Sequence, residues 1–314
     1  MIAVRRLSLL LVTLLSVLCS PAQATTPTLT DTPAQTRPIP RPDHVVIVIE
    51  ENHSYPEIIG SSAAPYINSL ALQGASFTQS YAITHPSEPN YLAFFSGSTQ
   101  GVTDDSCPHT YAAANLASEL IAASLTFGGY SEGLPSVGYT GCTSGAYARK
   151  HNPWVNFSNV PSSDNLPLTS FPTDYSTLPT IAIVVPNLNN DMHDGTIQQG
   201  DSWLQQHINA YLQWATAHNS LLIVTWDEDD SSAGNHIPTI FVGPMVQPNQ
   251  YGETISHYNV LRTNQHPHAH EYADCAINAD RNEHADANPY EHTNRDASVH
   301  TDAHDYEHPD AHTE

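Results

Sequence analysis

Four short runs of apolar, mostly β-branched residues stand out along the chain. They are HVVIVI at 44–49, IAIVV at 181–185, LLIVT at 221–225 and TIFV at 239–242. Runs of this length, without alternating polar residues, are typical of strands that are buried on both faces of a sheet. We therefore expect these four segments to form the centre of one sheet.

Segments with helical spacing lie between these runs. Residues 201–217 carry an apolar stripe with Asp201 as the expected N-cap, residues 116–125 carry a second stripe, and residues 90–95 are expected to form a third helix. Buried strands that alternate with amphipathic helices predict an α/β layered domain, with a mostly parallel central sheet flanked by helices. Ligands in such sheets bind at the carboxyl ends of the strands.

The amino-terminal region has the three parts of a secretory signal peptide. Two arginines at positions 5 and 6 precede an apolar run at 7–19, and Ala22 and Ala24 form a small-residue cleavage site. We expect a signal peptide at 1–24 and a secreted or periplasmic protein. A lipoprotein signal at Cys19 is the alternative, but the bulky residues before it suit lipoprotein processing poorly. No later segment has the roughly 18 apolar residues of a membrane span, so we expect no stable membrane anchor.

The remaining chain divides into three parts by composition. A Pro/Thr-rich linker is expected at 25–42 and one catalytic-sized domain at 43–263. Residues 264–314 contain nine histidines, twelve acids and two arginines without aliphatic periodicity, which predicts a disordered tail. Its abrupt start also fits a frameshift. A metal-scavenging tail is the functional alternative, although its histidines show no fixed ligand spacing.

The cysteines and the charge balance of the middle part narrow its chemistry. Cys107 and Cys142 are expected to form a disulfide in an exported protein, and two unpaired buried thiols are the alternative. From 43 to 263 there are 19 acids and only three bases, Arg149, Lys150 and Arg262. Such a surface disfavours nucleic-acid binding. A phosphate substrate would therefore need a bound metal to supply compensating charge.

Polar clusters follow the expected strands. Glu51 and Asn52 come directly after the first strand and offer oxygen ligands for a hard cation, although such a pair also occurs in ordinary turns. Ser87 lies between two prolines in THPSEPNY at 84–91, at the expected start of a helix. The amino end of a helix favours both an alkoxide and an approaching phosphate, and a plain capping serine is the alternative.

A further acidic cluster, TWDEDD at 225–230, follows the third strand, with His236 beyond it. Four consecutive acids repel one another unless a cation offsets their charge, and a solvated loop is the alternative. Asp227 and Glu228 are nearest the strand and are the expected metal ligands, whereas Asp229 and Asp230 are expected to be solvated or structural. The segment 186–195 adds His193 and Asp194 at another strand end.

Together these segments resemble the bacterial phosphoesterase family that joins secreted acid phosphatases to non-haemolytic phospholipases C. The resemblance spans about residues 43–262. It rests on five ordered motifs: ENHS at 51–54, HPSEPNY at 85–91, HNPW at 151–154, NDMHDG at 190–195 and TWDED at 225–229. It implies an alkaline-phosphatase-like fold and a serine nucleophile at an active-site metal. The tail replaces the continuation expected after 261–263, which puts the family's last elements in doubt.

The resemblance also implies a role for each matching residue. The metal ligands would be Glu51, Asn52, Ser87, Asp227 and Glu228, with Ser87 also the nucleophile. The histidines 151, 193 and 236, with Asp194, would act on the phosphate, although each histidine alone is more often structural. The basic pair Arg149 and Lys150, together with His85, is expected to bind the substrate, and a solvated surface pair is the alternative.

The expected activity is hydrolysis of phosphate monoesters through a phosphoserine, possible substrates including phosphoinositide headgroups. An imidazolium that protonates the leaving alcohol predicts an acidic pH optimum. The alternatives are a phospholipase C acting on phosphodiesters, for which the domain is short, and a periplasmic metal-binding protein centred on the tail. Oxygen ligands favour Mg, Ca or Mn, while flanking histidines leave Zn or Fe open. The oligomeric state stays open.

Overall fold

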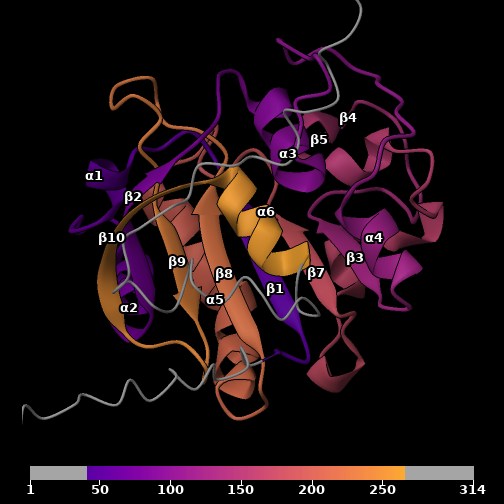
Figure 1. Cartoon of the computed structure of the whole chain (residues 1–314). Coiled ribbons are helices and arrows are strands. Elements are labelled where there is room, and N and C mark those ends of the chain that lie inside the picture. Colours follow the sequence, from indigo (N-terminus) through magenta and orange to yellow (C-terminus); the bar gives the residue numbers. More distant parts are fainter. Residues whose placement is uncertain (1–40, 266–314) are drawn as a thin grey trace, which may run out of the picture. The chain divides into compact units, whose positions relative to one another are not determined.

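One large sheet organises the part of the chain that the structure, a computed structural model, describes, which is residues 41–265 (Figure 1). Its eight strands follow the order β10-β2-β9-β8-β1-β7-β3-β6. The strands are β1 (Val45–Glu50), β2 (Ala75–Tyr81), β3 (Phe127–Ser131), β6 (Asn165–Pro167), β7 (Ile181–Val185), β8 (Leu221–Trp226), β9 (Thr239–Val242) and β10 (Asn249–Ser256). The expected signal peptide, nearly all of the expected linker and the tail from 266 lie outside the described residues.

The sheet is mostly parallel, as the sequence predicts. Only β9 runs antiparallel to its neighbours β8 and β2. The central strands β7, β1 and β8 are parallel and in close register, with Val45 opposite both Ile181 and Leu221. Their carboxyl ends therefore meet at one edge of the sheet, where the polar segments that follow them gather. The predicted α/β fold is confirmed.

The two faces of β1 belong to two separate hydrophobic cores, because successive side chains of a strand point to opposite faces. Val45, Ile47 and Ile49 pack in one core with α3 (Ser87–Ser96), α4 (Leu116–Ala122) and α6 (His257–Gln265). Val46 and Val48 pack in the other with α2 (Pro65–Gln73) and α5 (Ile197–Ala215). Helices thus cover both faces, which explains why the central strands contain almost no polar residues.

The helix predicted at 201–217 exists, but its predicted start is wrong. α5 begins at Ile197, and Thr196 caps it by accepting from the Gln199 amide. Asp201 lies inside α5 and is buried, and its carboxylate accepts from the Tyr66 and Ile67 amides. Asp201 therefore caps α2 instead of its own helix. The predicted stripe, which includes Leu204, is buried as expected.

Smaller elements complete the described part. They are α1 (Tyr55–Ile58), the hairpin β4 (Thr143–Ser144) and β5 (Tyr147–Ala148), and the 3-10 helices η1 (Arg149–His151), η2 (Pro153–Asn156), η3 (Ser162–Asp164), η4 (Leu168–Ser170) and η5 (Tyr175–Thr177). The predicted disulfide between Cys107 and Cys142 is present. At the carboxyl end, α6 runs to Gln265, two residues past the predicted end of the domain. Within 41–265, no helix has the length and apolar character needed to cross a membrane.

Candidate active site

The segments after β1, β7 and β8 meet the start of α3 at the carboxyl edge of the sheet. The Asp227 amide donates to the Glu50 carbonyl, and the Glu51 amide donates to the Asp191 carbonyl, so main-chain bonds tie the three strand ends together. α3 lies over this edge (Figure 1). The structure thereby brings Glu51, Ser87 and the acidic segment after β8 into contact.

Ser87 is the first residue of α3 and is almost fully buried. Pro86 precedes the helix, and Pro89 lies in its first turn, where the missing N–H costs no helical hydrogen bond. The Ser87 hydroxyl lies 3.2 Å from Glu51 Oε2 and 3.4 Å from Glu228 Oε1. A hydroxyl in this position combines the positive field of a helix amino end with two adjacent carboxylates.

The carboxylates around Ser87 lie in a strongly acidic environment. Burial raises the pKa of Glu51 well above its usual value, and the charges of Asp227 and Asp191 raise it further. Burial likewise raises the pKa of Asp227, with Glu228 as the next cause. Hydrogen bonds fix two of these groups: Tyr91 Oη donates to Glu51 Oε1 at 2.6 Å, and Asn90 Nδ2 donates to Glu228 Oε2 at 3.2 Å.

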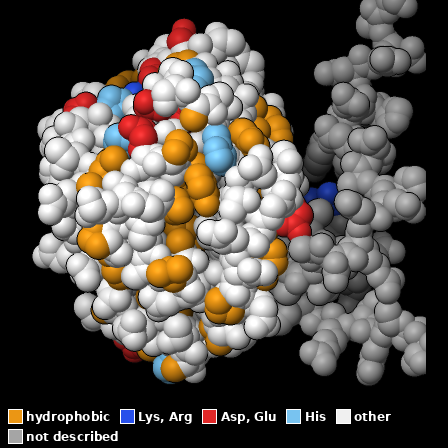
Figure 2. All heavy atoms as spheres, turned by 90° about the vertical axis from the view of Figure 1, so that its left-hand side faces the viewer, with side chains coloured by type: hydrophobic (Ala, Val, Ile, Leu, Met, Phe, Trp, Pro, Cys, Tyr) orange, Lys and Arg blue, Asp and Glu red, His pale blue; other side chains and the backbone are white. Residues whose placement is uncertain are grey.

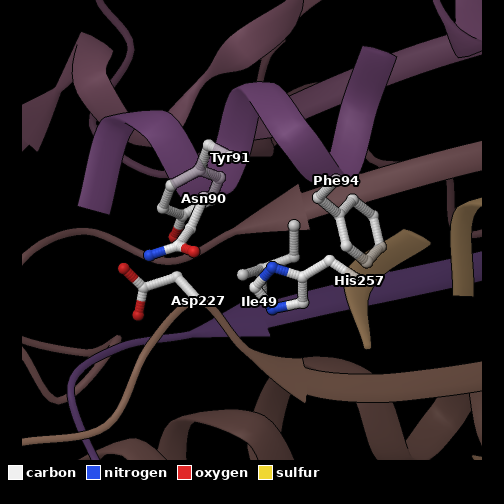
Figure 3. Close-up of a pocket in the computed structure, with 6 residues that line it drawn as sticks. All are labelled: Ile49, Asn90, Tyr91, Phe94, Asp227 and His257. Atoms are coloured by element: carbon white, nitrogen blue, oxygen red, sulfur yellow. The ribbon is translucent and has the colours of Figure 1, made fainter. Parts of the chain in front are cut away.

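Two oxygens in this cluster are buried without a hydrogen-bond partner, Asn52 Oδ1 and Asp227 Oδ2. Asn52 has a positive φ of 53°, and its amide donates to Asp227 Oδ1 at 3.2 Å. Asp227 faces α3, with Asn90 and Tyr91 on the helix above it (Figure 3). Buried oxygens without partners are costly unless something else satisfies them. Together with the neighbouring carboxylates they form a donor set that fits a hard divalent cation.

A second donor set adjoins the first. His151 Nε2 lies 3.0 Å from Glu51 Oε1 without making a hydrogen bond, and its Nδ1 lies 3.2 Å from Asp191 Oδ2. Glu51, His151 and His193 each offer a ligand atom within 4.8 Å of the others. Burial lowers the pKa of His151 well below its usual value, and the charge of Lys150 lowers it further. His151 is therefore neutral at neutral pH and can accept a metal or hold Asp191 in place.

Lys150 is the basic side chain at this site. Its Nζ lies 2.9 Å from Asp105 Oδ2 and 3.3 Å from His193 Nε2. Asp105 in turn accepts from the Glu88 amide in the first turn of α3 at 3.0 Å. His193 also contacts Asp194, with Nδ1 and Oδ1 2.8 Å apart, and the Asp194 side chain is largely exposed. The predicted residues 150, 193 and 194 thus lie side by side.

His85 connects the site to the loop after β8. Its Nδ1 lies 2.8 Å from Glu228 Oε2, and its Nε2 lies 3.1 Å from Asp229 Oδ1. Asp229 is buried and accepts from the amides of Ser231, Ala233 and Asn235, so it organises its own loop. Asp230 is exposed.

Arg149 and His236 have other partners. The Arg149 side chain is buried, and its guanidinium donates to the Thr140 carbonyl at 2.7 Å and the His109 carbonyl at 2.9 Å. The ring of His236 stacks between Tyr55 and Tyr81, and its Nε2 lies 2.9 Å from the Thr78 carbonyl. Through these contacts both side chains hold neighbouring segments in place, and neither contacts Ser87.

Three residues at the site had no assigned role in the sequence. Asp191 was visible as an acid in the segment after β7, but nothing singled it out from Asp194. Tyr91 lies one turn after Ser87 in α3, a spacing that could have signalled that it faces the same acids. Asp105 lies in a loop without periodicity, so no local pattern could place it beside Lys150.

Comparison with known proteins agrees with this picture. The model of the phosphoesterase family matches residues 61–268. A phosphatidylinositol-3-phosphatase from Mycobacterium tuberculosis is 58% identical over 223 residues, which cover 70% of this chain and 75% of that protein. An acid phosphatase from Aspergillus fumigatus is 32% identical, and the match covers 61% of this chain and about half, 48%, of the fungal protein.

Among solved structures, a protein of the alkaline phosphatase superfamily from Vibrio parahaemolyticus superimposes with a TM-score of 0.50 at 13% identity. The superposition covers 71% of this chain and 65% of that one. At this identity the likeness concerns the fold alone. It confirms the alkaline-phosphatase-like architecture that the motifs implied.

Proposed function

The chain belongs to the phosphoesterase family and is a phosphoric ester hydrolase, and we propose that it is a metal-dependent phosphomonoesterase with Ser87 as its nucleophile. One observation carries this proposal. The Ser87 hydroxyl lies at the amino end of α3, in contact with Glu51 and Glu228, beside buried oxygens that have no other partner. A cation would satisfy the buried oxygens, and a phosphate would bind beside the hydroxyl at the amino end of α3.

The metal would be held by Glu51, Asn52, Asp227 and Glu228, with Ser87 as a further ligand. This oxygen-rich set favours Mg, Ca or Mn. His151 and His193 offer a second set with Glu51, which would suit Zn or Fe. When bound, the metal would offset the charge of the buried carboxylates, lower the pKa of the Ser87 hydroxyl and polarise the phosphate.

The protein's own groups would supply the remaining steps. The Ser87 hydroxyl would lose its proton to solvent water, and its Oγ would form a bond to phosphorus while the bond from phosphorus to the alcohol oxygen breaks. Lys150 would hold the phosphate, since it is the basic side chain at the site. His193 is partly exposed and adjoins Lys150, so with a metal only in the first set it would be the histidine that protonates the departing alcohol. Water then hydrolyses the phosphoserine and frees Ser87.

The similar proteins suggest the substrates. One acts on phosphatidylinositol 3-phosphate by its name, and the others are acid phosphatases, so we propose phosphate monoesters that include phosphoinositide headgroups. The pattern at residues 1–24 supports export, and we propose that the enzyme acts outside the cytoplasm. Neither Arg149 nor His236 enters this proposal, because both are engaged elsewhere.

A substrate panel with matched serine variants tests the proposal. p-Nitrophenyl phosphate, bis(p-nitrophenyl) phosphate and a phosphoinositide would be assayed after chelation and after adding back Mg, Ca, Mn or Zn. Ser87→Ala should lower monoesterase activity by about a thousandfold or more. Ser96→Ala, at the other end of the same helix, should stay near the parent activity. Activity retained in a folded Ser87→Ala protein, or unaffected by chelation, would contradict the proposal.

A further inference from the structure

We propose that Glu88, the residue after Ser87, is a positioning residue for the reaction, because it fixes Lys150 relative to the nucleophile. Arg149 acts through Glu88 and not on the substrate. This inference rests on the proposed function, since it takes Ser87 as the nucleophile and Lys150 as the side chain that holds the phosphate. It adds the contacts that keep these two groups at a fixed separation.

The Glu88 side chain is buried at the start of α3 and is bonded to the chain segment that contains Lys150. Its Oε1 accepts from Asn156 Nδ2 at 3.0 Å, and Asn156 Oδ1 accepts from Arg149 Nε at 3.1 Å and Nη2 at 2.8 Å. All three side chains are buried, and we call Glu88, Asn156 and Arg149 the buried relay. Because Arg149 directly precedes Lys150 in η1, the buried relay holds the main chain of Lys150 against α3.

A second contact joins the other end of Lys150 to the same residue. Its Nζ donates to Asp105 Oδ2 at 2.9 Å, and Asp105 Oδ1 accepts from the Glu88 amide at 3.0 Å. Lys150 is therefore linked to Glu88 at both ends, through the buried relay at its main chain and through Asp105 at its ammonium group. Since Glu88 directly follows Ser87 in α3, these two links set the position of the ammonium group relative to the Ser87 hydroxyl.

The contacts of the Arg149 guanidinium make the buried relay rigid. Besides Asn156, the guanidinium donates to three main-chain carbonyls, those of Thr140, His109 and Val155. Its N–H donors lie in one fixed plane, so these bonds leave the side chain little freedom. A buried positive charge is also costly without an anion, and the Asn156 amide joins this one to the Glu88 carboxylate. Arg149 thus supports the segment from which Lys150 reaches the site.

The placement of Lys150 matters because its surroundings are acidic. Figure 2 shows acidic and histidine side chains at the upper end of one face, the end at which α3 lies in Figure 1, and Lys and Arg cover little of it. The Ser87 hydroxyl itself adjoins the carboxyl groups of Glu51 and Glu228. Apart from the proposed metal, Lys150 is therefore the group that would offset the charge of a phosphate. Misplacement of such a group by about 1 Å can lower the rate by about a hundredfold.

A double-mutant cycle tests whether Glu88 acts through Lys150. The measured quantities are kcat/KM for p-nitrophenyl phosphate, at a temperature where every variant is folded, and the melting temperature of each variant. Glu88→Ala removes the bond between the buried relay and α3. Glu88→Gln keeps an acceptor for Asn156, because the other carboxylate oxygen of Glu88 makes no hydrogen bond. Lys150→Ala and the double variant of Glu88→Ala with Lys150→Ala complete the cycle.

We expect Glu88→Ala to lower kcat/KM by about thirtyfold, and Lys150→Ala to lower it by about a hundredfold. The double variant should stay within about threefold of Lys150→Ala, because no lysine is left to misplace. Glu88→Gln removes the charge opposite Arg149, so it should melt at a lower temperature yet keep kcat/KM within about threefold of the parent value. Asn115→Ala is the matched control, since this buried asparagine caps α4; it should melt earlier and change kcat/KM by less than about twofold.

If Glu88→Ala does not fold, Asn156→Ala interrupts the same relay at its middle and takes its place in the cycle. Losses that multiply in the double variant, or parent activity in either single variant, would overturn the inference while leaving a Ser87-dependent monoesterase intact. A Glu88→Gln variant as inactive as Glu88→Ala would overturn it too. Activity retained in a folded Ser87→Ala protein would instead overturn the proposed function, and the inference with it.

Discussion

Consecutive acids at the ends of β1 and β8 have unlike environments although their charges are alike. Glu51 faces Ser87, whereas Glu50 is on the opposite face of β1, buried and without a hydrogen-bond partner. After β8, Asp227 and Glu228 face the start of α3. The Asp229 carboxylate accepts hydrogen bonds from amides of its own loop, and Asp230 is exposed. Strand alternation and the following turn therefore separate side chains that composition alone cannot distinguish.

This separation predicts unequal effects of two substitutions that each remove one negative charge. Asp227→Asn should weaken metal binding and lower activity by about a hundredfold or more, because it changes a buried proposed ligand. Added metal should partly restore that activity. Asp230→Asn should stay within about twofold of the parent enzyme. Activity measured while metal is titrated into each variant would check this prediction. Equal metal affinities in the two variants would mean that the proposed metal site is misplaced.

A second residue, His257, ties stability to pH. It is buried beneath α3, beside Phe94 and Ile49 (Figure 3), and its Nε2 lies 2.9 Å from the Trp226 carbonyl. Burial lowers the pKa of His257 to about 4. Between about pH 6.5 and 4 the unfolded chain thus binds a proton that the folded protein does not, so stability falls as the pH falls through this window.

Between pH 6.5 and 4, this one group should lower the free energy of unfolding by about 3 kcal/mol. The substitution His257→Gln should make this pH-dependent loss smaller, since glutamine keeps a donor for the Trp226 carbonyl but does not titrate. Urea unfolding at several pH values, with chelator present to remove metal effects, would measure the difference. The exposed His207→Gln is the control, and a pH dependence as steep in His257→Gln as in the parent would contradict this account.

At the scale of elements, the sequence predicted the strands that are both buried and continuously apolar. β3, with the sequence FGGYS, is also buried throughout but was not predicted, because its glycines and serine interrupt the apolar run. The strands β1, β7, β8 and β9 are apolar runs because helices or other strands cover them on all sides. The strands β2 and β10 were not predicted, since ASFTQSY and NQYGETIS carry polar residues at positions that are partly exposed. Apolar runs identify the centre of a sheet far better than its edge.

The same distinction applies to the site. The acids Glu51, Asp227 and Glu228 follow predicted strands, whose ends converge at one edge, and Ser87 lies near the start of a predicted helix. The family resemblance then joined these residues into one site. Asp105 and the pairing of Lys150 with it depend on loops that no periodic pattern describes. Arg149 was judged only by its charge, and the carbonyls that surround it are visible only in the folded chain.

Asp201 gives a prediction at this scale, because one side chain joins two helices. Its carboxylate accepts from the amides of Ile67 at 2.8 Å and Tyr66 at 3.2 Å in the first turn of α2. Asp201→Ala leaves both amides buried without a partner and should lower stability by about 1–3 kcal/mol. Gln205→Ala, on the exposed side of α5, should change the stability by less than about 0.5 kcal/mol. The two variants would be compared by their midpoints of urea unfolding. Equal midpoints would show that Asp201 does not cap α2.

At the scale of the whole molecule, the disulfide between Cys107 and Cys142 joins two segments of the chain, and each segment contributes residues to the site. The loop before Cys107 carries Asp105, and the chain after Cys142 passes through the β4–β5 hairpin to Lys150 and His151. The contact between Asp105 and Lys150 therefore lies near the closing point of a loop whose ends are 35 residues apart. We therefore expect the bond to stabilise the fold and also to restrain Asp105 and Lys150.

These two roles predict two measurable losses when both cysteines are replaced by serine. Closing a loop of this length stabilises a protein by about 3–4 kcal/mol through the entropy of the unfolded chain, so the melting temperature should fall clearly. Activity should also fall by about three- to tenfold at temperatures where the variant is still folded, mainly through a higher KM, because Lys150 is held less firmly. Asp201→Ala, which is expected to destabilise the fold through the contact between α5 and α2, is the control for stability alone. A cysteine variant with a lower melting temperature but the parent KM would show that the disulfide only stabilises the fold.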